Sequence, residues 1–286
     1  MEYVSFVKKE DQISFFRTVL KQLDLNHKQL ADLLSVTKSM IGHYLHGRCK
    51  ISLTKYLFLC EKCGIKHDNL FFNTIEVPKE YTIKIPKIDS KLAEFIGIIL
   101  GDGYMHKNEV VISSHSIDDI IYLREFVEPL TIDLFGKLPK YYFSKTSRNV
   151  KLKLQSRNIV TFLVSSGLNL GNKIRNNSAI PRWIFSNKKY LCACVRGIVD
   201  TDGSVFPKSR NPNLPQIEVS SRVPAIRDGF REALILLGFK PSKWSAGSNT
   251  PNCGLYARDQ VFKYYKKIGF NNPKHTKKFI NIFSGN

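Results

Sequence analysis

Two stretches of the chain, Leu92–Gly103 and Leu191–Gly203, follow one pattern. They read LAEFIGIILGDG and LCACVRGIVDTDG, and each is an apolar run of helical length that ends in Asp-Gly. Small residues recur four positions apart on one side of each helix: Gly97 and Gly101, then Ala193 and Gly197. Glycine inside a helix costs roughly 1 kcal/mol relative to alanine, and this cost is offset where two helix backbones touch. The pattern therefore predicts that the two helices pack together, with Asp102 and Asp202 side by side at their ends.

The chain after residue 90 repeats itself at a nearly constant spacing. Each Asp-Gly is followed by a strand, a second strand ending in Ser-Ser, a helix, another strand, a closing helix and a lysine. The later matching segments are 110–114 and 217–221, 130–140 and 233–243, 149–157 and 253–259, 159–168 and 261–270, and Lys173 and Lys274. This repeat predicts an α+β fold in which two αββαββα half-domains, 91–188 and 189–286, form a pseudo-twofold saddle with two antiparallel sheets.

The two motifs, as FIGIILGDG and VRGIVDTDG, resemble the signature of the LAGLIDADG homing endonucleases. The segment 171–183 resembles the junction in members that carry both motifs in a single chain. The resemblance implies that Asp102 and Asp202 bind metal, helped by the main-chain carbonyls of Gly101 and Thr201. It also implies that two lysines orient or polarise the attacking water, and that four further residues occupy variable water-network positions, where the family often has Gln or Lys. These residues are Lys173 and Lys274, and then Ser114, His115, Ser221 and Arg222.

Two carboxylates held close together repel each other and raise each other's pKa unless a cation neutralises them. Mg²⁺ takes a few carboxylate oxygens, keeps water ligands and completes its shell with phosphate, which suits in-line hydrolysis of a phosphodiester. The pair therefore predicts a Mg²⁺ cofactor, with Mn²⁺ able to replace it. Asp200 corresponds to Leu100 of the first motif, so we expect it to be only a solvated or structural group.

The charge of the chain favours a nucleic acid as partner. Its 44 Lys and Arg exceed its 24 Asp and Glu, for a net charge of +20 and a pI near 9.7. Neutralising phosphates and releasing their counterions supplies most non-specific affinity, and alternate residues of a curved sheet can follow the major groove. The candidates for DNA contact in the repeat are Lys107, Asn108, Lys145, Arg148, Lys151 and Lys153, and then Lys208, Arg210, Gln216, Lys243 and Arg258.

Residues 1–75 predict a separate unit built from helices only, followed by a linker over 76–90 that contains Pro78 and Pro86. Within it, the pattern LAxxLxVxxSxIxxYxxG from residue 30 resembles the helix-turn-helix of the Cro/repressor family. Thr37 and Ser52 are expected to cap helices, and Tyr44 is expected on the free face of the second motif helix. The resemblance implies a phosphate contact from Gln29 and base contacts from Lys38, Ser39 and His43. A helical bundle that binds protein is the alternative.

The motifs and charge together predict a site-specific double-strand DNA endonuclease, a phosphodiester hydrolase acting as a monomer on a long target site. The alternative is a non-catalytic DNA-binding regulator or an intron RNA maturase on the same frame. Both aspartates and both lysines are present, which favours the enzyme. No apolar run approaches the ~18 residues of a membrane span, and the six cysteines show no disulfide framework, so we expect a cytoplasmic protein with reduced thiols.

Overall fold

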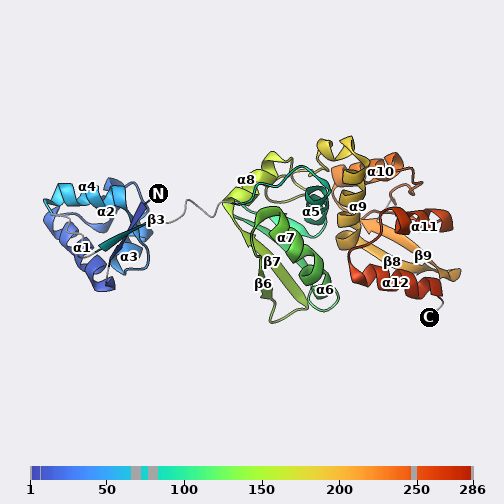
Figure 1. The fold of residues 1–286 in the computed structure, drawn as a ribbon, viewed down its shortest axis with the longest axis horizontal. Coiled ribbons are helices and arrows are strands. Elements are labelled where there is room, and N and C mark those ends of the chain that lie inside the picture. The colour runs from blue at the N-terminus through green and yellow to red at the C-terminus, as the bar shows by residue number, and fades with distance from the viewer. Residues whose placement is uncertain (1, 7, 66–71, 77–82, 246–249, 285–286) are drawn as a thin grey trace. The chain divides into compact units, whose positions relative to one another are not determined.

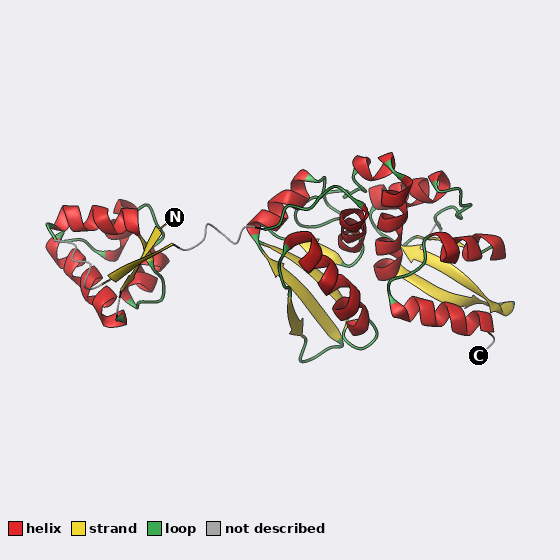
Figure 2. Cartoon of the chain, viewed as in Figure 1, coloured by secondary structure: helices red, strands yellow, loops and turns green. Residues whose placement is uncertain are grey.

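The computed structural model describes residues 2–6, 8–65, 72–76, 83–245 and 250–284. The chain divides into two compact units, Met1–Thr82 and Ile83–Asn286 (Figure 1). Both units contain helices and strands, and the strands form antiparallel sheets (Figure 2). No helix in these described ranges is long and apolar enough to span a membrane.

The first unit contains four helices and three strands among its described residues. In chain order they are β1 (Glu2–Phe6), α1 (Lys9–Gln22), α2 (His27–Leu33), α3 (Lys38–Leu45), β2 (Ile51–Ser52), α4 (Leu53–Cys63) and β3 (Phe72–Glu76). The strands form one antiparallel sheet in the order β2-β1-β3. The prediction of an all-α unit is therefore wrong. Its sheet pairs the two ends of the segment, which local helical periodicity cannot show.

The helix ends of this unit follow the sequence. Thr37 Oγ1 accepts a hydrogen bond from Met40 N at 3.3 Å, and Ser52 Oγ accepts one from Lys55 N at 3.4 Å, so both predicted caps are confirmed. Tyr44 differs from its prediction, because it is only 6% exposed and its ring stacks on Phe16 at 5.0 Å between centroids. The Tyr44 ring therefore packs in the core with Phe16 and does not lie on the free face of α3.

The second unit is organised on helices α5 (Ser90–Leu100) and α9 (Lys188–Asp202), which pack against each other (Figure 1). A Cβ atom on Gly97 would overlap the carbonyl oxygen of Cys194, and one on Gly197 would overlap the carbonyl oxygen of Glu94. The backbones touch where the glycines lie, because only hydrogen occupies the space of a side chain. The predicted packing of the two motif helices is confirmed.

The first half of this unit follows the expected order of elements. It comprises β4 (Gly103–Met105), β5 (Glu109–His115), a helical stretch formed by α6 (Ile120–Tyr122), the π-helical turn η1 (Leu123–Val127) and α7 (Glu128–Phe135), then β6 (Lys140–Phe143), β7 (Asn149–Gln155) and α8 (Arg157–Ser165). The sheet has the order β4-β5-β7-β6. In β7, Val150, Leu152 and Leu154 are fully buried while Lys151 is exposed, so one face of the sheet covers the core and the other faces solvent.

The second half departs from the repeat. After the short 3-10 helix η2 (Arg182–Ser186), it comprises α9, β8 (Gly203–Lys208), β9 (Asn211–Ser220), α10 (Pro224–Leu236), β10 (Asn252–Leu255), α11 (Arg258–Lys267) and α12 (Pro273–Ser284). Its sheet has three strands among the described residues, in the order β10-β9-β8. The expected strand at 253–259 is shorter, since α11 begins at Arg258, and α12 was not predicted at all.

Candidate functional site

The two motif aspartates lie at the C-terminal ends of the packed helices. Gly101 caps α5, and its missing side chain leaves room for Thr201 and for the carboxyl of Asp202, whose Cγ lies 3.5 Å from the ideal Cβ position. The backbone carbonyl of Asp102 accepts a hydrogen bond from Ser113 N at 3.1 Å, which ties the first aspartate to β5. The predicted juxtaposition of Asp102 and Asp202 therefore follows from the glycine seam between the helices.

Both aspartates are partly buried, and burial raises the pKa of each carboxyl. Burial, followed by the charges of Asp202 and Asp119, raises the pKa of Asp102 to about 7. Burial also raises the pKa of Asp202 to about 6, while the nearby Lys173 ammonium lowers it. Two carboxyls with raised pKa values at one place favour a cation beside them.

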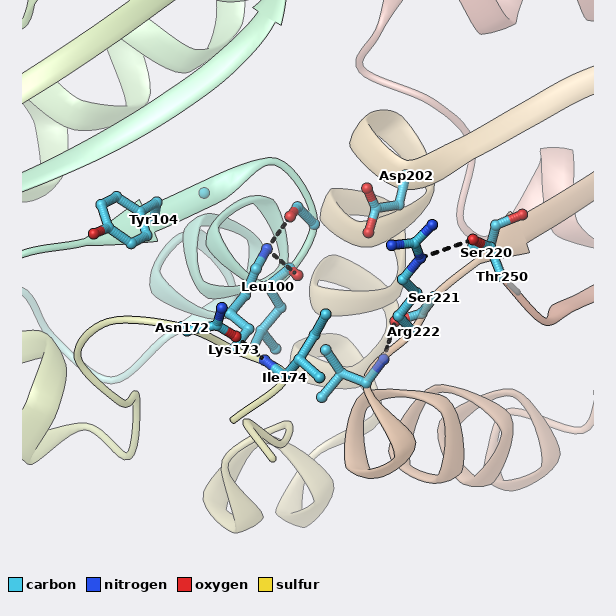
Figure 3. A pocket seen from close by; sticks show the side chains of 13 residues that line it. Leu100, Tyr104, Asn172, Lys173, Ile174, Asp202, Ser220, Ser221, Arg222 and Thr250 are labelled. Carbon is cyan, nitrogen blue, oxygen red and sulfur yellow. Dashed lines mark hydrogen bonds between the residues drawn. The ribbon is translucent and has the colours of Figure 1, made fainter. Parts of the chain in front are cut away.

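The Lys173 ammonium lies among the last carbonyls of α5. Nζ donates to Leu100 O at 2.8 Å and to Gly101 O (Figure 3). It also donates to Ile99 O at 3.3 Å. These carbonyls have no partner within the helix, because the last turn of any helix leaves its acceptors free. Burial lowers the pKa of Lys173, although the charges of Asp202 and Asp102 raise it. The oxygens at the end of α5 thus already surround a cation.

Lys274, which belongs to the second half, forms an ion pair with Asp119 in the site. Asp119 was not among the residues predicted from the sequence. Lys274 Nζ lies 2.7 Å from Asp119 Oδ1, and Asn272 Nδ2 donates to the same oxygen at 3.0 Å. Although burial raises it, these hydrogen bonds hold the pKa of Asp119 below its usual range. The signal that could have found Asp119 is weak, since it lies 153 positions from Asn272.

The four predicted water-network residues separate into two environments. Ser114 hydrogen-bonds to the Asp119 carboxylate, and His115 Nδ1 lies 3.0 Å from Asp118 Oδ2. Ser221 and Arg222 instead line a cavity of about 580 Å³ together with Lys173 and Asp202. Figure 3 shows Lys173 on one side of this cavity and Asp202 and Arg222 on the other.

Asp200 is structural, and the solvated alternative is wrong. It is 1% exposed, its Oδ2 accepts a hydrogen bond from Asn271 N at 2.9 Å, and burial raises its pKa to about 8. Beside it, Glu94 Oε2 pairs with Arg196 Nη2 at 2.5 Å across the two motif helices. Asn271 Nδ2 donates to the other oxygen of Glu94 at 2.5 Å. These buried and half-buried groups join α5, α9 and the loop before α12.

The predicted DNA-contact residues of the first half lie on the sheet and in the loops at its two ends. Lys151 and Lys153 point to the solvent face of the sheet, where Lys153 pairs with Glu109 at 3.3 Å and lies 5.2 Å from the Tyr142 ring. The loops at the ends of its hairpins carry the other candidates: Lys107, Asn108, Lys145 and Arg148, all exposed.

The second-half candidates are scattered. Gln216 lies on β9, Lys208 ends β8, Arg210 lies in the exposed turn after it, and Lys243 is exposed outside any strand. Arg258 was predicted on a strand, but it opens α11 and packs over the Phe262 ring at 5.8 Å. The prediction of a strand position for Arg258 is wrong, because the chain turns into helix three residues after β10.

In the first unit, Lys38 and Ser39 are exposed in the first turn of α3, and His43 is half-buried one turn later. Gln29 Oε1 accepts a hydrogen bond from Asn26 N at 2.9 Å, which closes a capping box at the start of α2. The α2–α3 turn passes through Ser35, whose φ is 50°.

No protein-family model matches the sequence, and no curated protein does. Among solved structures, the homing endonuclease I-DmoI in complex with DNA and Mn is similar with a TM-score of 0.46 and 16% identity, over 63% of this chain and 96% of that one. The N-terminal LAGLIDADG domain of DUF199/WhiA gives 0.46 and 16%, over 63% and 82%. Full-length DUF199/WhiA from Thermatoga maritima gives 0.46 and 15%, over 70% and 62%.

Proposed function

We propose that the chain is a LAGLIDADG-type DNA endonuclease that hydrolyses one phosphodiester bond in each strand at a specific site. The observation that carries the proposal is the shared site itself. Two carboxyls with raised pKa values lie at the ends of two helices in backbone contact, and a lysine ammonium lies beside both. Such a site stabilises a cation and the negative charge of a phosphate together.

The residues present fit a divalent metal. The donor set is hard, with the carboxylates of Asp102 and Asp202 and the main-chain oxygen of Thr201, as Mg²⁺ or Mn²⁺ requires. The main-chain oxygen of Gly101 would join them once Lys173 Nζ, which donates to it here, turns to the phosphate. The described residues contain no cluster of three or more His, Cys, Asp or Glu that could hold a metal, so phosphate and water would complete the shell. When bound, the metal would activate water and stabilise the leaving 3′ oxygen.

The chain's own residues have separate tasks in this proposal. Asp102 and Asp202 would hold the cation and thereby the scissile phosphates. Lys173 and Lys274 orient the attacking water and counter the charge that grows on the phosphate. Ser114, His115, Ser221 and Arg222 provide hydrogen bonds to surrounding water.

Mapping new DNA ends tests the proposal. The protein should generate paired ends at one recurrent sequence of genomic DNA in Mg²⁺ and none in EDTA. Retention of DNA without new ends would favour the non-catalytic regulator, and preference for structured RNA would favour the maturase.

We propose that DNA lies along the solvent faces of the two sheets of a pseudo-twofold saddle, and that the protein acts as a monomer. The basic residues listed for the two halves would contact its backbone. Residues 1–75 would add a helix-turn-helix contact through Gln29, Lys38, Ser39 and His43, connected by a linker over 76–90. This contact would extend a long target site.

Lys151→Ala should lower the salt dependence of DNA binding. Lys151 is exposed on the solvent face of β7, so its loss removes one phosphate contact, and the slope of log K against log[salt] should become shallower by about 0.9. Lys91→Ala is the control, because Lys91 pairs with Asp133 at 2.6 Å and belongs to the helix layer. Fluorescence anisotropy at several salt concentrations measures both slopes. Equal slopes for Lys151→Ala and wild type would contradict the placement of DNA on this sheet.

Without metal, the stability of the second unit should fall as the pH rises. The Asp102 carboxyl loses its proton near 3.8 when unfolded but near 7 when folded, so between these values the folded state binds more protons and the free energy of unfolding decreases with pH. From about pH 5 to about pH 8 in EDTA, wild type should lose at least about 1 kcal/mol more than Asp102→Asn.

Urea unfolding followed by tryptophan fluorescence measures this difference, since Trp183 and Trp244 both lie in the second unit. Mg²⁺ should restore more stability at the higher pH, because the metal binds the ionised carboxylates. If the free energy of unfolding depended on pH equally in wild type and in Asp102→Asn, the pKa of the Asp102 carboxyl would not be raised in the folded state.

A further inference from the structure

An acidic side chain, Glu218, lies on the face of the second sheet that is proposed to meet DNA. In β9, Ile217 and Val219 are buried against the core, so Glu218 between them points to the solvent face. It lies opposite Gly254 of the neighbouring strand β10. The repeat places Val111 at the matching position of the first sheet, so this carboxylate has no counterpart in the first half.

A tyrosine holds this carboxylate in place. Tyr256 Oη donates to Glu218 Oε2 at 2.6 Å. The tyrosine ring lies over Gly254, where an ideal Cβ atom would be 2.9 Å from its Cζ and 3.0 Å from its Oη. Burial, followed by the hydrogen bond to Glu218, raises the pKa of Tyr256, so the phenol keeps its proton and stays a donor. The missing side chain of Gly254 thus leaves the space in which Tyr256 reaches Glu218.

The charge of Glu218 has no cation beside it. On the first sheet, Glu109 pairs with Lys153 at 3.3 Å, whereas Glu218 forms no ion pair within residues 83–245 and 250–284. In the same ranges its Oε1 accepts no hydrogen bond. A carboxylate of this kind repels the phosphates of a duplex that lies on the sheet. Its position is therefore unfavourable for DNA binding unless it accepts a hydrogen bond from the DNA itself.

Cytosine offers the donor that this carboxylate needs. In the major groove, cytosine presents its N4 amino group, and Glu or Asp is the usual acceptor for it. Adenine also presents an amino group, but the N7 acceptor beside it repels a carboxylate. Guanine and thymine present acceptors without an amino donor on their major-groove edges. The free oxygen of Glu218 therefore fits cytosine better than any other base.

Glu218 lies close to the candidate catalytic site along the strand. Ser220 lines the cavity together with Lys173 and Asp202 (Figure 3), and Glu218 precedes Ser220 by two residues on the same face of β9. A strand rises about 3.3 Å per residue, so the two positions are about 7 Å apart along the sheet. We expect the base pair that Glu218 contacts to lie near the cut, in the part of the target that the second half covers.

We propose that Glu218 determines specificity by accepting a hydrogen bond from the N4 amino group of one cytosine in the major groove, and that Tyr256 is its positioning residue. The inference rests on the proposed placement of DNA along the solvent faces of the sheets. Basic side chains and net charge do not indicate this residue, because its charge has the same sign as that of DNA.

Selection of bound duplexes from a random DNA library, with the full chain in EDTA to prevent cleavage, tests the inference. Wild type should enrich C·G at one position where Glu218→Ala enriches no base. Measured on single duplexes, the Kd preference for C·G should fall there from at least about fivefold to about one. Glu218→Gln should prefer A·T at this position, because glutamine pairs with adenine N6 and N7.

Two further measurements separate base reading from a structural effect. Tyr256→Phe keeps the ring but loses the donor, so it should weaken the C·G preference at the same position and leave the other positions unchanged. Glu218→Ala should bind an unrelated duplex at least as tightly as wild type, because removing an anion removes no phosphate contact.

Glu232→Gln is the matched control, since Glu232 lies on α10 in the helix layer and pairs with Arg182 at 3.5 Å. It loses the same charge and should keep every base preference. Wild-type preferences in both Glu218 variants, or the same change in Glu232→Gln, would overturn the inference and leave the endonuclease function standing. A wild-type protein that binds all duplexes equally and cuts none in Mg²⁺ would overturn both.

Discussion

Asp102→Asn and Asp202→Asn should each abolish double-strand cleavage in Mg²⁺. Asparagine keeps the volume of aspartate and one oxygen but removes the charge that holds the cation, so the cleavage rate should fall by at least about 10³-fold. The basic residues proposed to bind DNA lie elsewhere on the sheets and in the first unit, so the Kd for the target should change by less than about fivefold. Cleavage of a labelled target duplex and anisotropy binding measure the two effects.

The matched control is Asp133→Asn. Asp133 is exposed on α7, pairs with Lys84 and Lys91, and has a pKa held below its usual range by those lysines. Its replacement should leave the cleavage rate unchanged. Near-wild-type cutting by either motif variant would show that the two carboxyls do not share the cation.

Gly97→Leu should unfold the second unit or lower its free energy of unfolding by at least about 3 kcal/mol. Even a Cβ atom at Gly97 would overlap the Cys194 carbonyl oxygen, and backbone cannot move aside as a flexible side chain can. Overpacking usually costs about 1–3 kcal/mol and more where relaxation is blocked. Gly97→Ala should therefore already be damaging, although alanine is the better helix former.

Gly229→Ala supplies the comparison within the same unit. Gly229 lies in α10, and a Cβ atom there would meet the Ile180 side chain at 3.4 Å, an ordinary contact. This variant should be neutral or stabilising by up to about 1 kcal/mol. Urea unfolding followed by the fluorescence of Trp183 and Trp244 compares them. A Gly97→Leu protein as stable as wild type would mean that the helices can separate without loss.

The motif helices could be predicted because their signal is local. Small residues four apart on an apolar helix, followed by Asp-Gly, specify both the close packing and the place of the two carboxyls. The same holds for Thr37 and Ser52, whose hydroxyls act within their own turns. Interactions of this kind form between residues that are close in the sequence, so the sequence predicts them.

Features that depend on distant pairing could not be predicted. The sheet of the first unit pairs Glu2–Phe6 with Phe72–Glu76. The residues next to each strand in the sequence do not indicate which segment it pairs with. In the sequence, Asp119 is an ordinary polar residue before a helix. Its contacts with Asn272 and Lys274 form only in the folded chain. The repeat predicts two equivalent lysines, Lys173 and Lys274. In the structure, Lys274 forms an ion pair with Asp119, whereas Lys173 hydrogen-bonds to main-chain carbonyls.

The shared cation is tested most directly by the anomalous scattering of Mn²⁺ in crystals of the protein with its target DNA. We expect a Mn²⁺ peak within coordination distance of both the Asp102 and the Asp202 carboxylates, with a main-chain oxygen of Gly101 or Thr201 and a scissile phosphate in the same shell. A peak that contacts only one aspartate, or no peak at the ends of α5 and α9 with DNA bound, would contradict it.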